Sequence, residues 1–152
     1  MRRVLDQAGV DRAIVIGHSL GGAVALQAAA IDSRIRAVVA ASTFSDLRSI
    51  ATERAPFVFS ADLIEAAFAR AQHDAQFVVN EVSPLLAAKT ITVPAFILHG
   101  ALDRGTPPTH SERVYDALNG PKRLLIVPNA GHNDLLSPGV WAQIEAWIDE
   151  LT

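Results

Sequence analysis

The chain has 152 residues, of which 50% are hydrophobic and 19% are charged. This length and composition are typical of one compact domain with an apolar core, and they argue against a disordered chain. The formal net charge of −3 provides no electrostatic basis for binding nucleic acid or an anionic membrane surface. The absence of cysteine excludes disulfides, thiol catalysis and cysteine-ligated metals. Because no signal peptide or membrane-spanning pattern is visible, we expect a cytoplasmic protein.

Apolar runs alternate with helix-type patterns along the chain. We expect four buried strands, at residues 13–16, 36–41, 94–100 and 122–127. We expect helices at residues 1–8, 23–30, 60–72 and 108–118, a helical turn from residue 83, and a final helix from residue 137. Strands and helices in alternation predict an α/β fold, with a parallel sheet of about four strands flanked by helices.

Residues 42–92 separate the second and third expected strands. They are interpreted as a lid-like helical insertion within a single domain that covers residues 1–152. Four phenylalanines of this segment are candidates for lining an acyl pocket, although core packing is the simpler role for each: Phe44, Phe57, Phe59 and Phe68.

The first expected strand runs directly into a Gly-x-Ser-x-Gly motif, and good helix formers follow it. Strand, sharp turn and helix are the context of a nucleophile elbow, which would hold Ser19 on a strained turn with its hydroxyl exposed. Gly17 and Gly21 are expected to keep Cβ atoms away from the closest approach of strand and helix. The helix N-terminus would face the serine, so the N–H of Leu20 is the expected oxyanion donor.

Two other interpretations of this segment are weaker. A serine between glycines often marks only a turn, but the flanking strand and helix favour the elbow. The uncharged run at residues 13–31 also has the length of a membrane span. His18, Gln27 and the Gly21-Gly22 pair inside this run argue against a span, as does the break in its periodicity.

The loops after the third and fourth expected strands each contain a residue type that a nucleophilic serine requires. Asp103 follows the third strand and His132 follows the fourth. The carboxyl ends of parallel strands meet at one edge of the sheet, so we expect both side chains to lie near Ser19. The histidine would act as the base and the aspartate would orient its ring. Asp134 is a competing carboxylate, but it lies too close to His132 in the sequence to fit this pattern.

The other histidines are expected to have different roles. His18 lies inside the elbow and is expected to point away from the nucleophile and shape the substrate pocket. His99 is expected to be structural, while His73 and His110, on predicted helices, are expected at the surface. No cluster has the spacing of metal ligands, and residues 17–22 do not match a dinucleotide-binding motif. We therefore expect neither a metal nor another cofactor.

These motifs resemble the α/β-hydrolase superfamily. The elbow, residues 83–108 and residues 122–136 are similar to the C-terminal half of dienelactone-hydrolase-like and serine-aminopeptidase-like members. The resemblance covers nearly the whole chain, and Ser19, Asp103 and His132 match the nucleophile, acid and base of these families. It implies hydrolysis of esters, or less often of amides or thioesters. The segment 105–107 departs from the family pattern, in which an apolar residue precedes the proline.

The resemblance also implies a truncated fold, because superfamily members carry several strands before the elbow and this chain has only a short helix there. The loop that supplies their second oxyanion donor has no counterpart, so we expect turnover reduced by a factor of about 10²–10³. The first strand is expected to be a bare apolar edge. We expect a homodimer or higher oligomer to cover it, through paired edges or a domain swap of residues 42–92.

The sequence thus predicts a serine carboxylesterase that acts on small or short-chain esters through an acyl-enzyme. The expected partner is a small-molecule ester substrate, without nucleic acid or membrane. Two alternatives stay open. An acyltransferase would use the same residues with an alcohol in place of water, and a non-catalytic fragment or interaction module would keep the fold without turnover.

Overall fold

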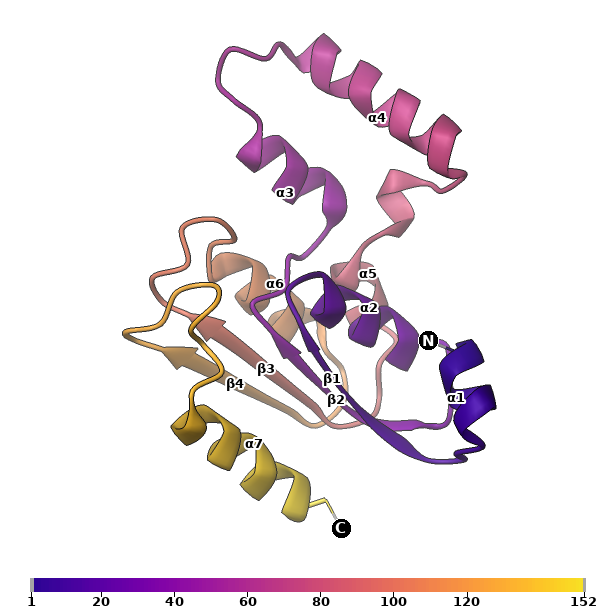
Figure 1. The fold of residues 1–152 in the computed structure, drawn as a ribbon, viewed down its shortest axis with the longest axis vertical. Coiled ribbons are helices and arrows are strands. Elements are labelled where there is room, and N and C mark those ends of the chain that lie inside the picture. The colour runs from indigo at the N-terminus through magenta and orange to yellow at the C-terminus, as the bar shows by residue number, and fades with distance from the viewer. Residues whose placement is uncertain (1, 152) are drawn as a thin grey trace.

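A four-stranded parallel sheet in the order β1-β2-β3-β4 lies at the centre of the computed structural model, which describes residues 2–151 (Figure 1). The strands are β1 (Ala13–His18), β2 (Ile35–Ala41), β3 (Ala95–Gly100) and β4 (Lys122–Val127). Each pairs in parallel with its neighbour. The α/β class and the four expected strands are confirmed.

The described residues also form seven α-helices: α1 (Arg2–Ala8), α2 (Leu20–Ala29), α3 (Leu47–Arg54), α4 (Ala61–Ala75), α5 (Pro84–Ala88), α6 (Thr109–Ala117) and α7 (Pro138–Asp149). A short 3₁₀ helix, η1, covers Val79–Glu81. The expected first helix began at Met1, which lies outside the described residues. Helix α2 begins earlier than expected, directly after Ser19.

The sequence did not predict α3 or η1. Helix α3 has one buried residue, Ile50, and so lacks the apolar stripe by which amphipathic helices are found. Its start is nevertheless marked, because the Asp46 carboxylate accepts the backbone N–H of Ser49 at 2.7 Å. This is an N-cap, and Asp46 followed by an apolar residue was the available signal.

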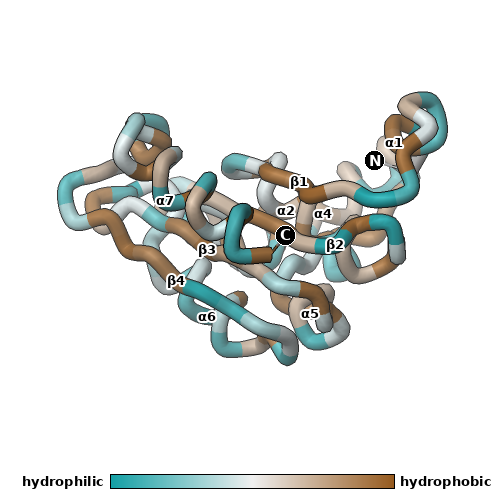
Figure 2. Tube along the Cα trace, turned by 90° about the horizontal axis from the view of Figure 1, so that it is seen from below, coloured by the Kyte–Doolittle hydropathy of each residue, from teal (hydrophilic) through white to brown (hydrophobic). Residues whose placement is uncertain are grey.

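The core has two layers, one on each face of the sheet. On one face, α1, α2, α5 and α6 pack against the strands through residues such as Leu5, Leu26, Ala88 and Val114. On the other face, α7 packs against the strands through a cluster that includes Ile144. Figure 2 shows the apolar strands passing between α7 and the α5–α6 layer.

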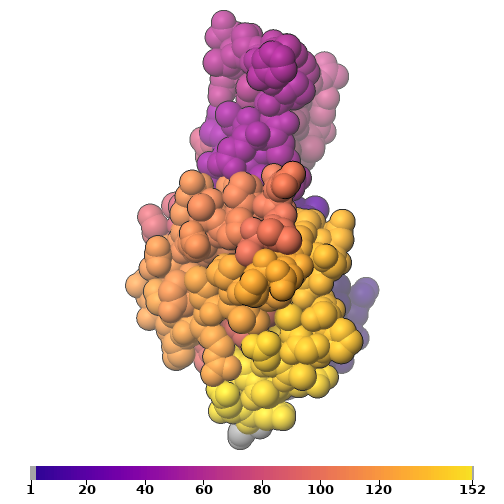
Figure 3. All heavy atoms as spheres, turned by 90° about the vertical axis from the view of Figure 1, so that its left-hand side faces the viewer, coloured from indigo at the N-terminus to yellow at the C-terminus, as the bar shows by residue number. Residues whose placement is uncertain are grey.

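The 42–92 segment leaves the body of the protein at the end of β2 and returns before β3. Helices α3 and α4 stand above the sheet in Figure 1, and the same projection is visible in Figure 3. The apolar stripe expected to bury α4 is mostly exposed. Phe68 is buried and Leu63 is 51% exposed, and the stripe also contains Ile64, Ala67 and Ala71, none of which is buried. The Phe68 ring instead lies 4.6 Å from the Arg48 guanidinium of α3.

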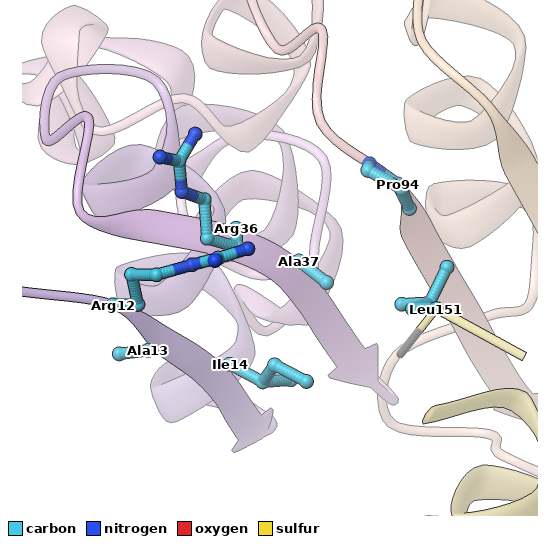
Figure 4. A pocket seen from close by; sticks show the side chains of 7 residues that line it. All are labelled: Arg12, Ala13, Ile14, Arg36, Ala37, Pro94 and Leu151. Atoms are coloured by element: carbon cyan, nitrogen blue, oxygen red, sulfur yellow. The ribbon is translucent and has the colours of Figure 1, made fainter. Parts of the chain in front are cut away.

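Strand β1 is at the edge of the sheet, as expected. Ile16 is 39% exposed, because α7 covers the neighbouring strands and leaves β1 open. A hollow of about 580 Å³ lies beside this region, lined among others by Arg12, Ile14, Arg36 and Leu151 (Figure 4). These residues lie at the amino ends of β1 and β2 and at the end of α7. The hollow is therefore at the opposite end of the strands from Ser19. Within residues 2–151, no helix has both the length and the apolar character needed to cross a membrane.

Candidate active site

Ser19 occupies a strained turn between β1 and α2, with φ 54° and ψ −120°. A positive φ is unfavourable for a residue with a side chain, and such strain often marks a functional position. The Ser19 N–H donates to the carbonyl of Ala41 at 2.8 Å, which ties the turn to the end of β2. Leu20 is the first residue of α2, so its N–H has no acceptor within the helix.

The expected steric role is confirmed for Gly17 and is wrong for Gly21. A Cβ added to Gly17 would lie 2.1 Å from the carbonyl oxygen of Gly21, which no side chain tolerates. A Cβ added to Gly21 would meet nothing within 4 Å, so this expected steric role is wrong. The tight contact falls on Gly22 instead, where an added Cβ would lie 3.1 Å from Cβ of Thr43.

The structure brings the three predicted triad residues together. Nε2 of His132 lies 2.9 Å from Oγ of Ser19, and Nδ1 of the same ring lies 2.6 Å from Oδ2 of Asp103. The carboxylate is buried and the histidine is half-buried. The three side chains thus form one hydrogen-bonded chain at the carboxyl ends of β1, β3 and β4.

Backbone groups hold the buried Asp103 carboxylate. Its Oδ1 accepts the N–H groups of Gly105 at 3.0 Å and of Thr106 at 2.8 Å. Burial raises the pKa of the Asp103 carboxyl, but the Thr106 N–H and the hydrogen bond and charge of His132 outweigh burial. The net effect is a pKa below the ordinary value for aspartate, so the group is ionised at neutral pH and accepts hydrogen bonds.

His99 lies beside Asp103 and has a structural role, as expected. Its fully buried ring donates from Nε2 to the carbonyl of Thr106 at 2.8 Å, and the same nitrogen lies 3.3 Å from Oδ2 of Asp103. Nδ1 lies 2.6 Å from the Ser111 hydroxyl. Burial lowers the pKa of His99, so the ring is neutral and Nδ1 is the acceptor.

Two residues fix the loop that carries His132. His18 donates from Nε2 to the carbonyl oxygen of His132 at 2.7 Å, so it positions the loop backbone, a role that sequence reasoning missed. Asp134 accepts the N–H of Gly131 at 2.6 Å. Its carboxylate therefore closes the turn that contains His132, and Asp103 is the carboxylate at Nδ1.

A model of the prolyl oligopeptidase family matches residues 4–152. The chain belongs to this family. The expected membership of the α/β-hydrolase superfamily is thereby confirmed.

This member of the prolyl oligopeptidase family spans only part of the length of the proteins that it resembles. "Uncharacterized protein YfhR" of Escherichia coli K12 is 32% identical over 129 residues, which is 84% of this chain and 40% of that protein. Acetyl xylan esterase from Paenibacillus sp. R4 superposes with a TM-score of 0.76 at 23% identity, covering 97% of this chain and 50% of the esterase. Acylaminoacyl peptidase from Pyrococcus horikoshii has a TM-score of 0.63 at 19% identity, over 88% of this chain and 22% of that one.

His110 was expected at the surface and is completely buried. Its Nδ1 accepts the N–H of Ser45 at 3.1 Å, and its Nε2 donates to Glu53 at 2.9 Å. The reason is that the 42–92 segment folds back over α6, a contact between elements far apart in the sequence. His73 is exposed, as expected.

The four phenylalanines of the 42–92 segment divide into two groups. Phe44 and Phe68 are each 8% exposed, and Phe44 packs with Ile50 beside α2, so both have the core role. Phe57 is 99% exposed and Phe59 is 47% exposed, both in the loop between α3 and α4. Neither lines an enclosed acyl pocket. Among the described residues, no group of three His, Asp or Glu side chains is placed to hold a metal ion.

Proposed function

We propose that the chain is a serine carboxylesterase that hydrolyses small esters through an acyl-enzyme. The observation that carries the proposal is the hydrogen-bonded chain from Ser19 through His132 to Asp103 on a nucleophile elbow. Membership of a hydrolase family supports it. The shared fold does not separate esters from amides, because both an esterase and a peptidase superpose on the chain.

The protonation states follow from the contacts. The ionised Asp103 carboxylate accepts hydrogen bonds and donates none, so Nδ1 of His132 carries the ring hydrogen. Nε2 is then free to accept the Ser19 hydroxyl proton. In the proposed reaction Ser19 Oγ attacks the acyl carbon while Nε2 takes its proton. The imidazolium that forms is stabilised by the carboxylate, and it returns the proton to the leaving alcohol.

The second half of the proposed reaction uses the same groups. Water gives a proton to Nε2 of His132 as its oxygen attacks the acyl carbon, and Ser19 leaves with the returned proton. The negative oxygen of each tetrahedral intermediate is assigned to the N–H of Leu20, aided by the N-terminus of α2. An ester suits a site with one assigned donor better than an amide, because resonance stabilises the ester carbonyl less and an alkoxide leaves more readily than an amide anion.

The test is hydrolysis of p-nitrophenyl acetate by the wild type and by Ser19→Ala, with Ser33→Ala as the control. Ser33 is exposed in the turn before β2, far from the elbow. The proposal requires turnover that is lost in Ser19→Ala and kept in Ser33→Ala. Equal rates in wild type and Ser19→Ala, with both folded, would refute it. Transfer of acetyl to added alcohol, measured as the ratio of products, would identify an acyltransferase instead.

A further inference from the structure

The turn after β3, residues 103–106, is called the acid turn here, because it orients the Asp103 carboxylate. The N–H groups of Gly105 and Thr106 hold Oδ1, and this leaves Oδ2 directed at His132. The direction of Oδ2 therefore depends on the backbone of the acid turn. A group that fixes Gly105 and Thr106 also fixes the alignment of acid and base.

Arg54 contacts both of these residues. Its Nε donates to the carbonyl of Gly105 at 2.7 Å, and its Nη2 donates to the Thr106 hydroxyl at 2.6 Å. A guanidinium presents its donors in a rigid planar fork, so the two bonds set both position and orientation. A Cβ added to Gly105 would lie 3.4 Å from Nη2 of Arg54 and 3.7 Å from Oδ1 of Asp103, so the guanidinium and the carboxylate both lie close to this glycine.

The helix that carries Arg54 is itself anchored to the body of the protein. Glu53, the preceding residue, accepts a hydrogen bond from the buried His110 of α6 at 2.9 Å. At the other end of α3, Asp46 caps the helix, and Ser45 donates to the same histidine. An exposed arginine on a loosely held helix would have little effect on the acid turn, but Arg54 projects from a helix that is fixed at both ends.

We infer that Arg54 is a positioning residue: it holds the acid turn and so couples the 42–92 segment to the alignment of Asp103 with His132. The inference rests on the proposed function. Arg54 has no assigned contact with substrate and acts through Asp103. Displacement of α3 would thus disturb the alignment of Asp103 with His132.

The variants are Arg54→Ala and Arg54→Lys, with Arg48→Ala as the matched control. Arg48 lies in the same helix, but its contacts are with Asn80, Glu65 and Phe68 inside the 42–92 segment. We expect Arg54→Ala to lower kcat for p-nitrophenyl acetate by about tenfold to a hundredfold with KM little changed, as small displacements of catalytic groups do. Arg54→Lys should restore part of this loss, because an ammonium can satisfy one acceptor but not both in the same geometry.

A second readout does not require turnover. The proton that Nδ1 of His132 shares with Asp103 gives a downfield NMR signal, which should shift or broaden in Arg54→Ala and stay unchanged in Arg48→Ala. If Arg54→Ala does not fold, Thr106→Val removes the hydroxyl contact alone and should produce a smaller change of the same kind. An unchanged signal in a folded Arg54 variant, or an equal change in Arg48→Ala, would overturn the inference. Because the signal is independent of catalysis, a failure of the esterase assay is distinguished from a failure of the inference.

Discussion

The substitution Asp103→Asn separates the charge of the acid from its geometry. The amide has one oxygen and one NH₂ group, and the structure decides where each must lie. Oδ1 accepts two backbone N–H groups, from Gly105 and Thr106, so the amide oxygen has to occupy that place. The NH₂ group then faces Nδ1 of His132, where the carboxylate oxygen lies in the wild type.

This arrangement forces the wrong tautomer on the base. With the NH₂ group of the introduced amide facing it, Nδ1 of His132 becomes an acceptor and the ring hydrogen moves to Nε2. Nε2 then cannot accept the proton of Ser19. An aspartate-to-asparagine change with this consequence in a serine protease triad lowers kcat by about 10⁴, and we expect a loss of that order here.

The assay is kcat for p-nitrophenyl acetate at saturating substrate, with the fold checked by circular dichroism. Asp134→Asn is the matched control, because the Asp134 carboxylate accepts the backbone N–H of Gly131 and the amide oxygen of the introduced asparagine can do the same. A loss smaller than about tenfold in Asp103→Asn, or an equal loss in Asp134→Asn, would refute the assignment of Asp103 as the acid.

Four other predictions concern the elbow glycines, His18, the pH dependence of stability and the β1 edge. Gly17→Ala should destabilise the fold by about 3 kcal/mol or more in urea unfolding, whereas Gly21→Ala, whose added Cβ meets nothing within 4 Å, should be tolerated. His18→Phe should lower kcat several-fold, because it loses a hydrogen bond of about 1 kcal/mol to the loop of the base; an unchanged kcat would contradict that positioning role. Because the fold lowers the pKa of Asp103, its carboxylate stabilises the protein fully above the ordinary pKa of aspartate. This stabilisation is lost as the pH falls through the lower pKa of the folded state. The melting temperature against pH, in wild type and Asp103→Asn, checks this. We also propose that two copies pair through the open β1 edge; sedimentation should find a dimer that Ile16→Lys converts to monomer, and a wild-type monomer would contradict the pairing.

Much of the sheet and of the candidate site could be predicted because both depend on local patterns. A short β-branched run before Gly-x-Ser-x-Gly is enough to place Ser19 at the end of a strand. Parallel topology then brings the loops with Asp103 and His132 to the same edge. The order of these three residues and their positions after strand ends were therefore enough to predict the site. Neither requires knowledge of contacts between segments far apart in the sequence.

The parts that could not be predicted depend on how the 42–92 segment folds back on the body. His110 looks like a surface residue on its own helix, and only the return of α3 buries it against Ser45 and Glu53. Arg54 carries no motif, and its role becomes visible only when α3 lies beside the acid turn. The close contact that an added Cβ would make at Gly22, and not at Gly21, likewise depends on Thr43, which lies just after β2.

The most direct test of the central claim is the detection of an acyl-enzyme on Ser19. The protein is mixed with p-nitrophenyl acetate, quenched in acid, digested and examined by mass spectrometry, with Ser19→Ala treated in parallel. The account predicts one acetyl group on the peptide that contains Ser19, with a burst of p-nitrophenol that Ser19→Ala lacks. Absence of that adduct and burst in folded wild-type protein, or equal hydrolysis by Ser19→Ala, would contradict the account.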